Sequence, residues 1–235
     1  MRPVLAADSI SKSFGHLRVL TSARLGVAAG GITLLAGRNG SGKSTLMRIC
    51  AGRLAPDQGN VRLDGRIWTR PRLHILAGLG VYYIPDRDIL SPIRTVRFHL
   101  AAIQERFGGA RSIAEVAGLL KITHCLDRCP REISGGERRR AEIAMALVRA
   151  PRCLLADEPL RGIDPSDRHV ILDALRELAD SGSAVLVSGH ETSDLLEVAD
   201  AVTWVTSGTT YDLGSGVAAL RHERFKREYL TGSWR

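Results

Sequence analysis

The sequence predicts an α/β fold, in which helices cover a parallel sheet and a block of helices interrupts it. Two short apolar runs of the kind that form buried strands, "CLLAD" at 153–157 and "AVLVSGH" at 184–190, flank a segment with helical spacing at 166–182. A strand–helix–strand order implies a parallel sheet, and ligand chemistry in such sheets gathers at the carboxyl ends of the strands. From about Ser91 to Ala150 the pattern is helical, which indicates an insertion into this frame.

The first third of the chain reads mainly as strands. "GITLLAG" at 31–37 is an apolar run that ends in glycine, as a buried strand entering a turn does. "STLMRICAGRL" follows at 44–54 with helical spacing, and Gly52 lies near the expected end of that helix. "GNVRLDGRIW" at 59–68 alternates apolar and polar residues, which predicts a half-buried strand with a turn.

Three segments of the middle region carry apolar residues three and four positions apart. They are "TVRFHLAAIQERF" at 95–107, "SIAEVAGLLKI" at 112–122 and "GERRRAEIAMALVRA" at 136–150. This spacing places the apolar side chains of each segment on one face, so we expect three amphipathic helices.

Length and composition indicate a globular protein that stays in the cytoplasm. The chain has 235 residues, of which 44% are hydrophobic and 25% charged. No apolar run approaches the ~18 residues of a transmembrane helix, and the N-terminus lacks the apolar block of a signal peptide. The net charge of +8 suits phosphate ligands, an anionic membrane surface or nucleic acid, but the basic residues are spread along the chain, so we expect no nucleic acid partner.

The cysteines give a weak signal for metal binding. Cys50, Cys125, Cys129 and Cys153 form no CxxC pair. His124 lies close to Cys125 and Cys129 in the chain, but a metal site at this place needs a fourth ligand. We therefore expect reduced, partly buried thiols.

A phosphate-binding loop is the strongest local motif. "GRNGSGKST" fits the pattern G-x-x-x-x-G-K-[ST] between a predicted strand and a predicted helix. Its glycines let backbone N–H groups crowd around phosphate oxygens, and the helix that follows points its positive end at them. Lys43 is expected to reach the β- and γ-phosphates, and the Ser44 hydroxyl to hold Mg²⁺. The residues expected to bind the nucleotide are Gly37, Arg38, Asn39, Gly40, Ser41, Gly42, Lys43, Ser44 and Thr45.

A second motif places two acids at the end of a buried strand. "CLLADEP" at 153–159 brings Asp157 and Glu158 to the edge of the sheet where the phosphate loop also lies. Asp157 is expected to anchor Mg²⁺. Glu158, one residue further, is expected to orient or deprotonate the attacking water. The alternative is that Asp157 and Glu158 form a solvated turn without a function. The presence of the phosphate loop favours the functional interpretation over this alternative.

The order of these motifs around "ISGGERRR" at 133–140 resembles that of an ATP-binding-cassette (ABC) ATPase, the nucleotide-hydrolysing subunit of ABC transporters. A Ser-Gly-Gly segment that opens a helix offers N–H groups to an anion. In this family that anion is the γ-phosphate of ATP held by a second ATPase subunit. The residues that match are Ser134, Gly135, Gly136 and Glu137.

Three further positions match the family in order. Phe14 resembles the aromatic residue that stacks on adenine, and Asp164 resembles the residue of the loop that contacts the partner subunit. His190 resembles the switch histidine that contacts the γ-phosphate. The subgroup signal, from "GGERRRAEIAMAL", "GIDP" and "FKREYLTG", is similar to the lipopolysaccharide-export ATPase and to the branched-chain amino-acid importer ATPases.

One position departs from the family. In "YIPDRDILSPIRT" the family's loop has a glutamine after an apolar-Pro pair, and here Asp86 follows Ile84 and Pro85. An aspartate can still ligate Mg²⁺, but it adds a negative charge beside the triphosphate unless the metal or an arginine such as Arg87 offsets it. Asp86 is therefore kept as a nucleotide and metal contact.

The resemblance implies a single ABC ATPase domain over 1–235. It would consist of a RecA-like P-loop NTPase core with an antiparallel β subdomain, formed by 1–88 and 151–235, and an inserted helical subdomain at 89–150 carrying the SGGE motif. The implied catalytic residues are Lys43, Glu158 and His190, and the implied metal ligands are Ser44, Asp86 and Asp157.

The implied activity is Mg²⁺-dependent ATP hydrolysis that powers transport. The implied partners are a transmembrane permease and a second ABC subunit, which would hold the chain on the inner face of the cell membrane. Two alternatives remain: a non-transport ABC ATPase acting in DNA repair or translation, and a weakly hydrolysing regulatory cassette paired with an active one.

Overall fold

Two β-sheets form the frame of the molecule. The computed structural model describes residues 3–109, 111–189 and 193–230. Within them a six-stranded sheet has the order β10-β9-β3-β8-β7-β6, in which all neighbours are parallel except the antiparallel pair β9–β10. Its strands, in chain order, are β3 (Ile32–Ala36), β6 (Val81–Ile84), β7 (Cys153–Ala156), β8 (Ala184–Gly189), β9 (Ala201–Thr206) and β10 (Thr209–Asp212).

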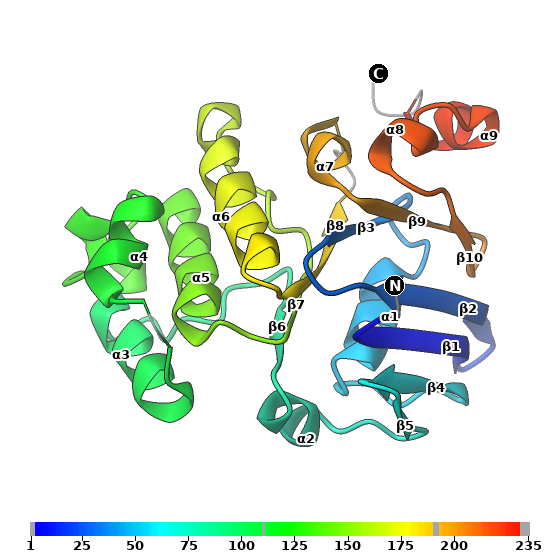
Figure 1. Cartoon of the computed structure of the whole chain (residues 1–235), viewed down its shortest axis with the longest axis horizontal. Coiled ribbons are helices and arrows are strands. Elements are labelled where there is room, and N and C mark those ends of the chain that lie inside the picture. Colours follow the sequence, from blue (N-terminus) through cyan, green and yellow to red (C-terminus); the bar gives the residue numbers. More distant parts are fainter. Residues whose placement is uncertain (1–2, 110, 190–192, 231–235) are drawn as a thin grey trace.

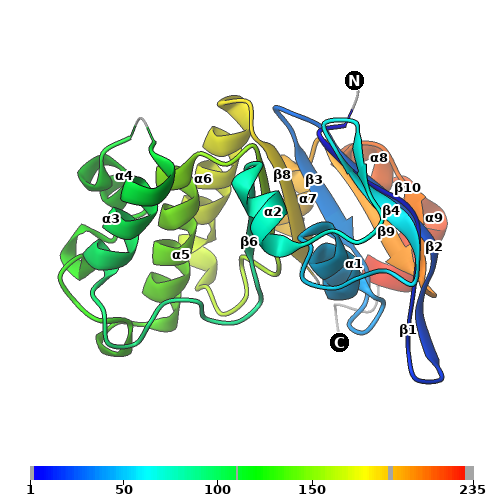
Figure 2. The same ribbon diagram turned by 90° about the horizontal axis from the view of Figure 1, so that it is seen from below.

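The second sheet is antiparallel and lies at one end of the molecule (Figure 2). Its order is β2-β1-β4-β5. The strands are β1 (Leu5–Phe14), β2 (Leu17–Val27), β4 (Gln58–Leu63) and β5 (Arg66–Trp68). Figure 1 shows α1 (Lys43–Cys50) between this sheet and the six-stranded one.

Three helices between β6 and β7 form the opposite end of the molecule (Figure 1). They are α3 (Val96–Phe107), α4 (Ile113–Leu119) and α5 (Gly135–Arg149). Thr95, Ser112 and Ser134 cap their N-termini, because each side-chain oxygen accepts a backbone N–H three residues on. The predicted inserted helices are thus confirmed; the division of the chain into subdomains at 88 and 150 stays a prediction.

The remaining helices include one that the sequence predicts and several that it does not. The predicted helix is α6 (Arg168–Asp180), which crosses from β7 to β8. The others are α2 (Leu73–Gly78), α7 (Ser193–Val198) and α8 (Gly216–Ala219), while α9 (Glu223–Phe225) lies in the basic stretch 221–230, whose sequence indicates a helix with a solvated face. No helix within the described ranges is both long enough and apolar enough to cross a membrane.

The core occupies both faces of the six-stranded sheet. Alternate residues of a strand point to opposite faces, so Leu34 belongs to one buried cluster and Leu35 to the other. The cluster around Leu35 packs the sheet against α1 and the antiparallel sheet. The cluster around Leu34 continues without a break into α3–α5, where it includes Leu100 and Val116.

Candidate functional site

Three neighbouring parallel strands bring the candidate residues to one edge of the sheet. β8 lies between β3 and β7 in the sheet order. The phosphate loop follows β3, Asp157 follows β7, and Ser188 lies near the end of β8. Since parallel strands end at the same edge, Ser188 falls between the loop and the acid.

The phosphate loop has the backbone that its glycines permit. Gly40 and Gly42 have φ of 79° and 107°, in the left-handed region. A Cβ atom on Gly42 would lie 2.8 Å from Leu20 Cδ2 of strand β2, so the loop also needs glycine there for space. Helix α1 then begins at Lys43 and directs its N-terminus at the loop.

Lys43 is buried under its own loop. The residue is 5% exposed, and Nζ donates to the carbonyl oxygens of Gly37 at 2.7 Å and Arg38 at 3.1 Å. Burial lowers the pKa of Lys43, while the negative charges of Glu158 and Asp157 oppose that shift. The ammonium group therefore lies within the field of both acids, as the sequence predicts for one phosphate-binding centre.

A cavity of about 270 Å³ joins the loop to Glu158. Its lining residues, apart from Val19 of β2, are all candidates from the two sequence motifs. They are Asn39, Gly40, Gly42, Lys43, Ser44, Thr45 and Glu158. One cavity thus presents a cation, loop N–H groups, a hydroxyl and a carboxylate to the same ligand.

A larger cavity of about 600 Å³ adjoins the same loop. It shares Val19, Asn39 and Gly40 with the smaller one, and the β9–β10 turn bounds it. Lys43 and Glu158 line only the smaller of the two. The chemistry expected of a triphosphate therefore belongs to the smaller cavity.

Asp157 is fully buried and accepts hydrogen bonds from three hydroxyl groups. Ser44 Oγ donates to Oδ1 at 3.2 Å, and Ser188 Oγ donates to the same oxygen at 2.6 Å. Tyr83 Oη donates to Oδ2 at 3.3 Å. Because Ser44 Oγ and Asp157 Oδ1 are already in contact, both can face one small hard cation, and their oxygen donors suit Mg²⁺.

Glu158 has an unusual backbone conformation. Its φ is 50°, a value that side chains with a Cβ rarely adopt. Its N–H donates to Ser188 Oγ at 3.0 Å, and its carboxylate lies 4.0 Å from the Arg161 guanidinium. The side chain is 16% exposed, so the carboxylate is held close to the protein beside the cavity.

Asp86 follows β6 and is paired with an arginine, although a different one from that expected. Its Oδ1 lies 3.9 Å from Nη2 of Arg48, a residue of α1, whereas Arg87 is exposed. Arg48 also lies near the hydroxyl of Tyr83. Burial, followed by the charge of Asp157, raises the pKa of Tyr83 to about 12, so its proton stays available for Asp157. Arg48 and Tyr83 thus lie between Asp86 and Asp157, the expected metal ligand.

The SGGE segment forms a helix N-terminus apart from the cavity. Ser134 and Glu137 make a reciprocal capping box, with Glu137 N donating to Ser134 Oγ at 3.1 Å and Ser134 N donating to Glu137 Oε2 at 2.7 Å. Among the residues that the structure describes, the 270 Å³ cavity takes none of its lining from 134–137.

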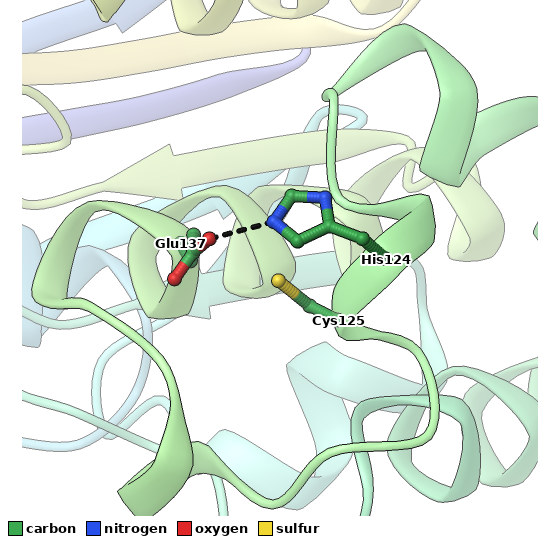
Figure 3. Close-up of side chains that lie close together, drawn as sticks. All are labelled: His124, Cys125 and Glu137. Atoms are coloured by element: carbon green, nitrogen blue, oxygen red, sulfur yellow. Dashed lines mark hydrogen bonds and ion pairs between the residues drawn. The ribbon is translucent and has the colours of Figure 1, made fainter.

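Glu137 also joins a small cluster with His124 and Cys125 (Figure 3). His124 Nε2 lies 2.7 Å from Glu137 Oε1, and the possible ligand atoms of the three residues lie within 4.8 Å of one another. The Ser134 N–H, with the His124 contact, lowers the pKa of Glu137 to about 2, whereas burial raises the pKa of Cys125 to about 11. A structural zinc site takes four protein ligands, whereas this cluster offers three among the described residues, and both Glu137 oxygens already accept hydrogen bonds, so the arrangement favours a hydrogen-bonded cluster. All four cysteines are free, as expected.

The other three family positions lie outside this centre or beyond the described residues. Phe14 ends β1, is 50% exposed and has Lys12 Nζ 5.7 Å from its ring centroid. Asp164 is exposed and accepts hydrogen bonds from the N–H and hydroxyl of Ser166, which lower its pKa. His190 lies outside the described residues.

The structure therefore brings the phosphate loop, Asp157 and Glu158 together, with Asp86 linked indirectly. Sequence reasoning missed Ser188 and Tyr83. The signal for Ser188 was its position as the one polar side chain in "AVLVSG", a strand that is buried throughout. The signal for Tyr83 was weaker, because an aromatic residue in an apolar run is usually part of a core.

Known proteins resemble this chain over almost its whole length. The family model described as ABC transporter matches residues 20–161. The lipopolysaccharide export system ATP-binding protein LptB of Escherichia coli (strain K12) is 32% identical over 241 residues, covering 98% of both chains. LptB of Haemophilus influenzae is 31% identical over 236 residues, covering 97% of both.

A solved structure shows the same architecture. The ADP conformation of an ATP-binding cassette of an ABC transporter has a TM-score of 0.84 and 25% identity, and the match covers 98% of this chain and 99% of that one. The predicted P-loop NTPase core with its antiparallel sheet and inserted helices is thus confirmed.

Proposed function

This chain belongs to the ABC transporter family as an ATP-binding and ATP-hydrolysing subunit, and we propose that it hydrolyses Mg²⁺-ATP in the cavity between the phosphate loop and Glu158. The observation that carries this proposal is the shared lining of that cavity by Lys43, Ser44 and Glu158. Loop N–H groups and the Lys43 ammonium would neutralise the phosphates, for which Lys43 exchanges its bonds to the Gly37 and Arg38 carbonyls.

Ser44 and Asp157 are the residues that would hold Mg²⁺, with Asp86 as a further oxygen donor. The metal supplies charge neutralisation for the phosphates when it is bound. Asp157 is prepared for that role, because its carboxylate already accepts hydrogen bonds from three hydroxyl groups. Glu158 would accept a hydrogen bond from the attacking water and orient it towards the γ-phosphate.

The SGGE segment would act on the nucleotide of a second subunit. Its helix N-terminus lies away from this chain's own cavity, which supports a role across an interface. We propose that Ser134, Gly135 and Gly136 contact the γ-phosphate held by that subunit, and that Asp164 and His190 complete the interface. The interface between the two subunits would therefore contain two nucleotides.

The helical region offers a surface for a transmembrane partner. Between β6 and α3, and on α3 itself, Ile89, Ile93 and Phe98 are exposed by 37%, 69% and 49%. These residues follow Asp86 in the chain. A change of conformation at the nucleotide site would therefore be transmitted to a partner helix that packs against them. We propose that this contact couples hydrolysis to transport and holds the chain on the inner face of the membrane.

Two variants test the nucleotide centre. Glu158→Gln removes the charged base but keeps the shape, so it should bind ATP as tightly as the parent and lose turnover by about 100-fold or more. Lys43→Ala removes the phosphate cation and should weaken ATP affinity by about tenfold or more. Affinity is measured with a fluorescent ATP analogue and turnover as phosphate release. Glu197→Gln on α7 is the matched control and should match the parent. Near-normal hydrolysis by Glu158→Gln would overturn the proposal.

A separate measurement tests the transport role. Tagged parent chain is purified from mild detergent extracts, and the copurifying proteins are identified. A multi-span membrane protein that is lost with Phe98→Asp would support coupling through the helical region. Recovery with ribosomes or DNA-repair proteins would favour a non-transport ABC ATPase.

A further inference from the structure

The Arg139 guanidinium is buried where three segments meet. They are α5, which begins with the SGGE segment, the segment after β6 that contains Asp86, and the end of β7. The Arg139 side chain is 9% exposed. Nη2 donates to the carbonyl oxygens of Asp157 at 2.6 Å and Glu158 at 3.0 Å, and Nε donates to that of Pro159 at 3.3 Å. Nη1 donates to the carbonyl oxygen of Pro85 at 2.9 Å. This one side chain of α5 thus binds the carbonyl oxygens of three consecutive residues, with Glu158 in the middle. It also binds the carbonyl oxygen of Pro85, the residue before Asp86.

Glu142, one turn further along α5, completes this arrangement. Its side chain is 1% exposed, and Oε2 accepts a hydrogen bond from Arg139 Nη1 at 2.8 Å. Its Oε1 accepts the N–H of Ile89 at 2.8 Å. Burial raises the pKa of Glu142, and the Arg139 charge opposes that shift. The pair therefore binds both Pro85 and Ile89, which bracket Asp86.

We propose that Arg139, supported by Glu142, is a positioning residue that sets the backbone of Glu158 according to the position of the SGGE helix. This inference rests on the proposed function, since it concerns the same catalytic carboxylate.

The backbone of Glu158 needs such support. A φ of 50° is disfavoured for glutamate, so the conformation persists only where neighbours hold it. Ser188 accepts the N–H on one side of the residue, and on the other side the carbonyl accepts from Arg139 and from the N–H of Arg161 in the following turn. A planar guanidinium can serve several carbonyl oxygens in fixed directions, whereas an ammonium group acts as a point charge.

The same contacts make Glu158 sensitive to movement of α5. Arg139 lies five residues after Ser134 on one continuous helix, so a shift of the SGGE segment moves the guanidinium as well. If α5 moves relative to β7, the bonds to Asp157 and Glu158 lengthen and the Glu158 backbone is released. The helix that binds the partner's nucleotide would thereby switch this chain's own catalytic residue.

Steady-state kinetics of the full chain test the proposal. Arg139→Lys keeps the positive charge but loses the planar set of N–H donors, and Arg139→Gln loses both. We expect KM for ATP within about twofold of the parent and a fall in kcat of about tenfold for Lys and about 100-fold for Gln. ATP affinity of each variant is measured separately with the fluorescent analogue. Unchanged kcat in a folded Arg139→Gln would overturn the proposal.

Arg149 provides a matched control on the same helix. When the whole residue is counted, Arg149 and Arg139 are each 7% exposed. The Nη2 of Arg149 donates to the Ala77 carbonyl oxygen at 2.6 Å. The guanidinium also lies 4.0 Å from the Phe107 ring centroid. Arg149→Lys should lower the melting temperature without changing kcat of the folded protein. An equal fall in kcat would show a general effect of disrupting α5 and would overturn the proposal.

A paired variant separates positioning from simple charge burial. Replacing a buried ion pair by apolar residues commonly restores stability lost in the single variants. Arg139→Met combined with Glu142→Leu should therefore recover part of the melting temperature lost in the single variants, because the four carbonyl oxygens still lose their donor, and should keep the low kcat. Recovery of kcat together with stability would overturn the proposal. If the proposed function is wrong, Glu158→Gln retains turnover whatever the Arg139 variants do. If only the role of Arg139 is wrong, Glu158→Gln loses turnover while the Arg139 variants keep the parent kcat.

Discussion

The Ser188 hydroxyl bridges the two acids that follow β7: it donates to Asp157 Oδ1 at 2.6 Å and accepts the N–H of Glu158 at 3.0 Å. Ser188 is fully buried in β8, between the strand of the phosphate loop and the strand of the acids. One hydroxyl group therefore fixes both the carboxylate that is proposed to bind Mg²⁺ and the backbone of the proposed base.

Removal of this hydroxyl is expected to slow turnover. Ser188→Ala leaves the buried N–H of Glu158 without its acceptor, at a cost of about 1–3 kcal/mol. We expect kcat to fall about tenfold and the Mg²⁺ concentration for half-maximal activity to rise, because Asp157 also loses a donor. Ser188→Thr keeps the hydroxyl and serves as the control, with kcat within about threefold of the parent. Parent-like kinetics of Ser188→Ala would contradict the assigned role.

Asp86 should tune the metal dependence of the reaction. Asp86→Gln removes a carboxylate near Arg48 and should raise the Mg²⁺ concentration for half-maximal turnover by about two- to tenfold, since one hard, charged donor is lost. ATP affinity measured without Mg²⁺ should stay the same or improve. Asp88→Asn is the control, because Asp88 is 66% exposed and pairs with Arg138. If the magnesium titration of Asp86→Gln superimposes on that of the parent, this carboxylate lies outside the site.

Phe14 is expected to contribute to the binding of ATP and not to its hydrolysis. The ring is half exposed at the end of β1, where it can offer a face to an adenine base. Stacking of a base on an aromatic side chain is worth about 1–3 kcal/mol, so Phe14→Ala should raise KM for ATP about tenfold with kcat unchanged. Phe14→Trp should preserve KM. Ile67→Ala removes another exposed apolar side chain of the same sheet and controls for surface effects; a KM effect equal to that of Phe14→Ala would count against stacking.

Glu137 gives the folded protein a predictable response to acid. Its folded-state pKa of about 2 lies below the unfolded value of about 4.3, so the unfolded chain binds more protons between these values. The stability from this carboxylate is therefore present above about pH 4.3 and is lost as pH falls towards 2. Glu137→Gln keeps an acceptor for Ser134 N–H but removes the titration, which flattens the curve by at most about 1.4 kcal/mol per pH unit. Urea unfolding from pH 6 down to 3 measures the slope, and equal slopes in parent and variant would refute the prediction. Glu115→Gln is the control.

Much of the fold was predictable because its signals are local. β3, β7 and β8 are apolar runs bounded by glycine or acids, and α3–α5 carry helical periodicity. By contrast, α2 (Leu73–Gly78) is only six residues long, and its N-cap residue Arg72 makes no side-chain cap hydrogen bond. Its structure follows from packing between segments far apart in sequence.

The C-terminal segment shows the same limit. The basic stretch around Phe225 reads as a solvated helix face, yet Phe225 is fully buried and its ring lies 5.6 Å from that of Trp204. That partner comes from β9, about twenty residues earlier, and no local pattern reveals it. Likewise, "RRR" at 138–140 does not say which guanidinium reaches the carbonyls after β7. Such contacts depend on the tertiary fold.

The buried cluster that runs from Leu34 and Leu154 of the sheet to Leu100 and Val116 of the helices has a thermodynamic consequence. A boundary between two independently melting units would have to cut through this apolar interior and expose it to water. The helical region and the sheet should therefore unfold in one calorimetric transition. Their slowest backbone amides should then exchange with solvent at a common free energy, that of global unfolding.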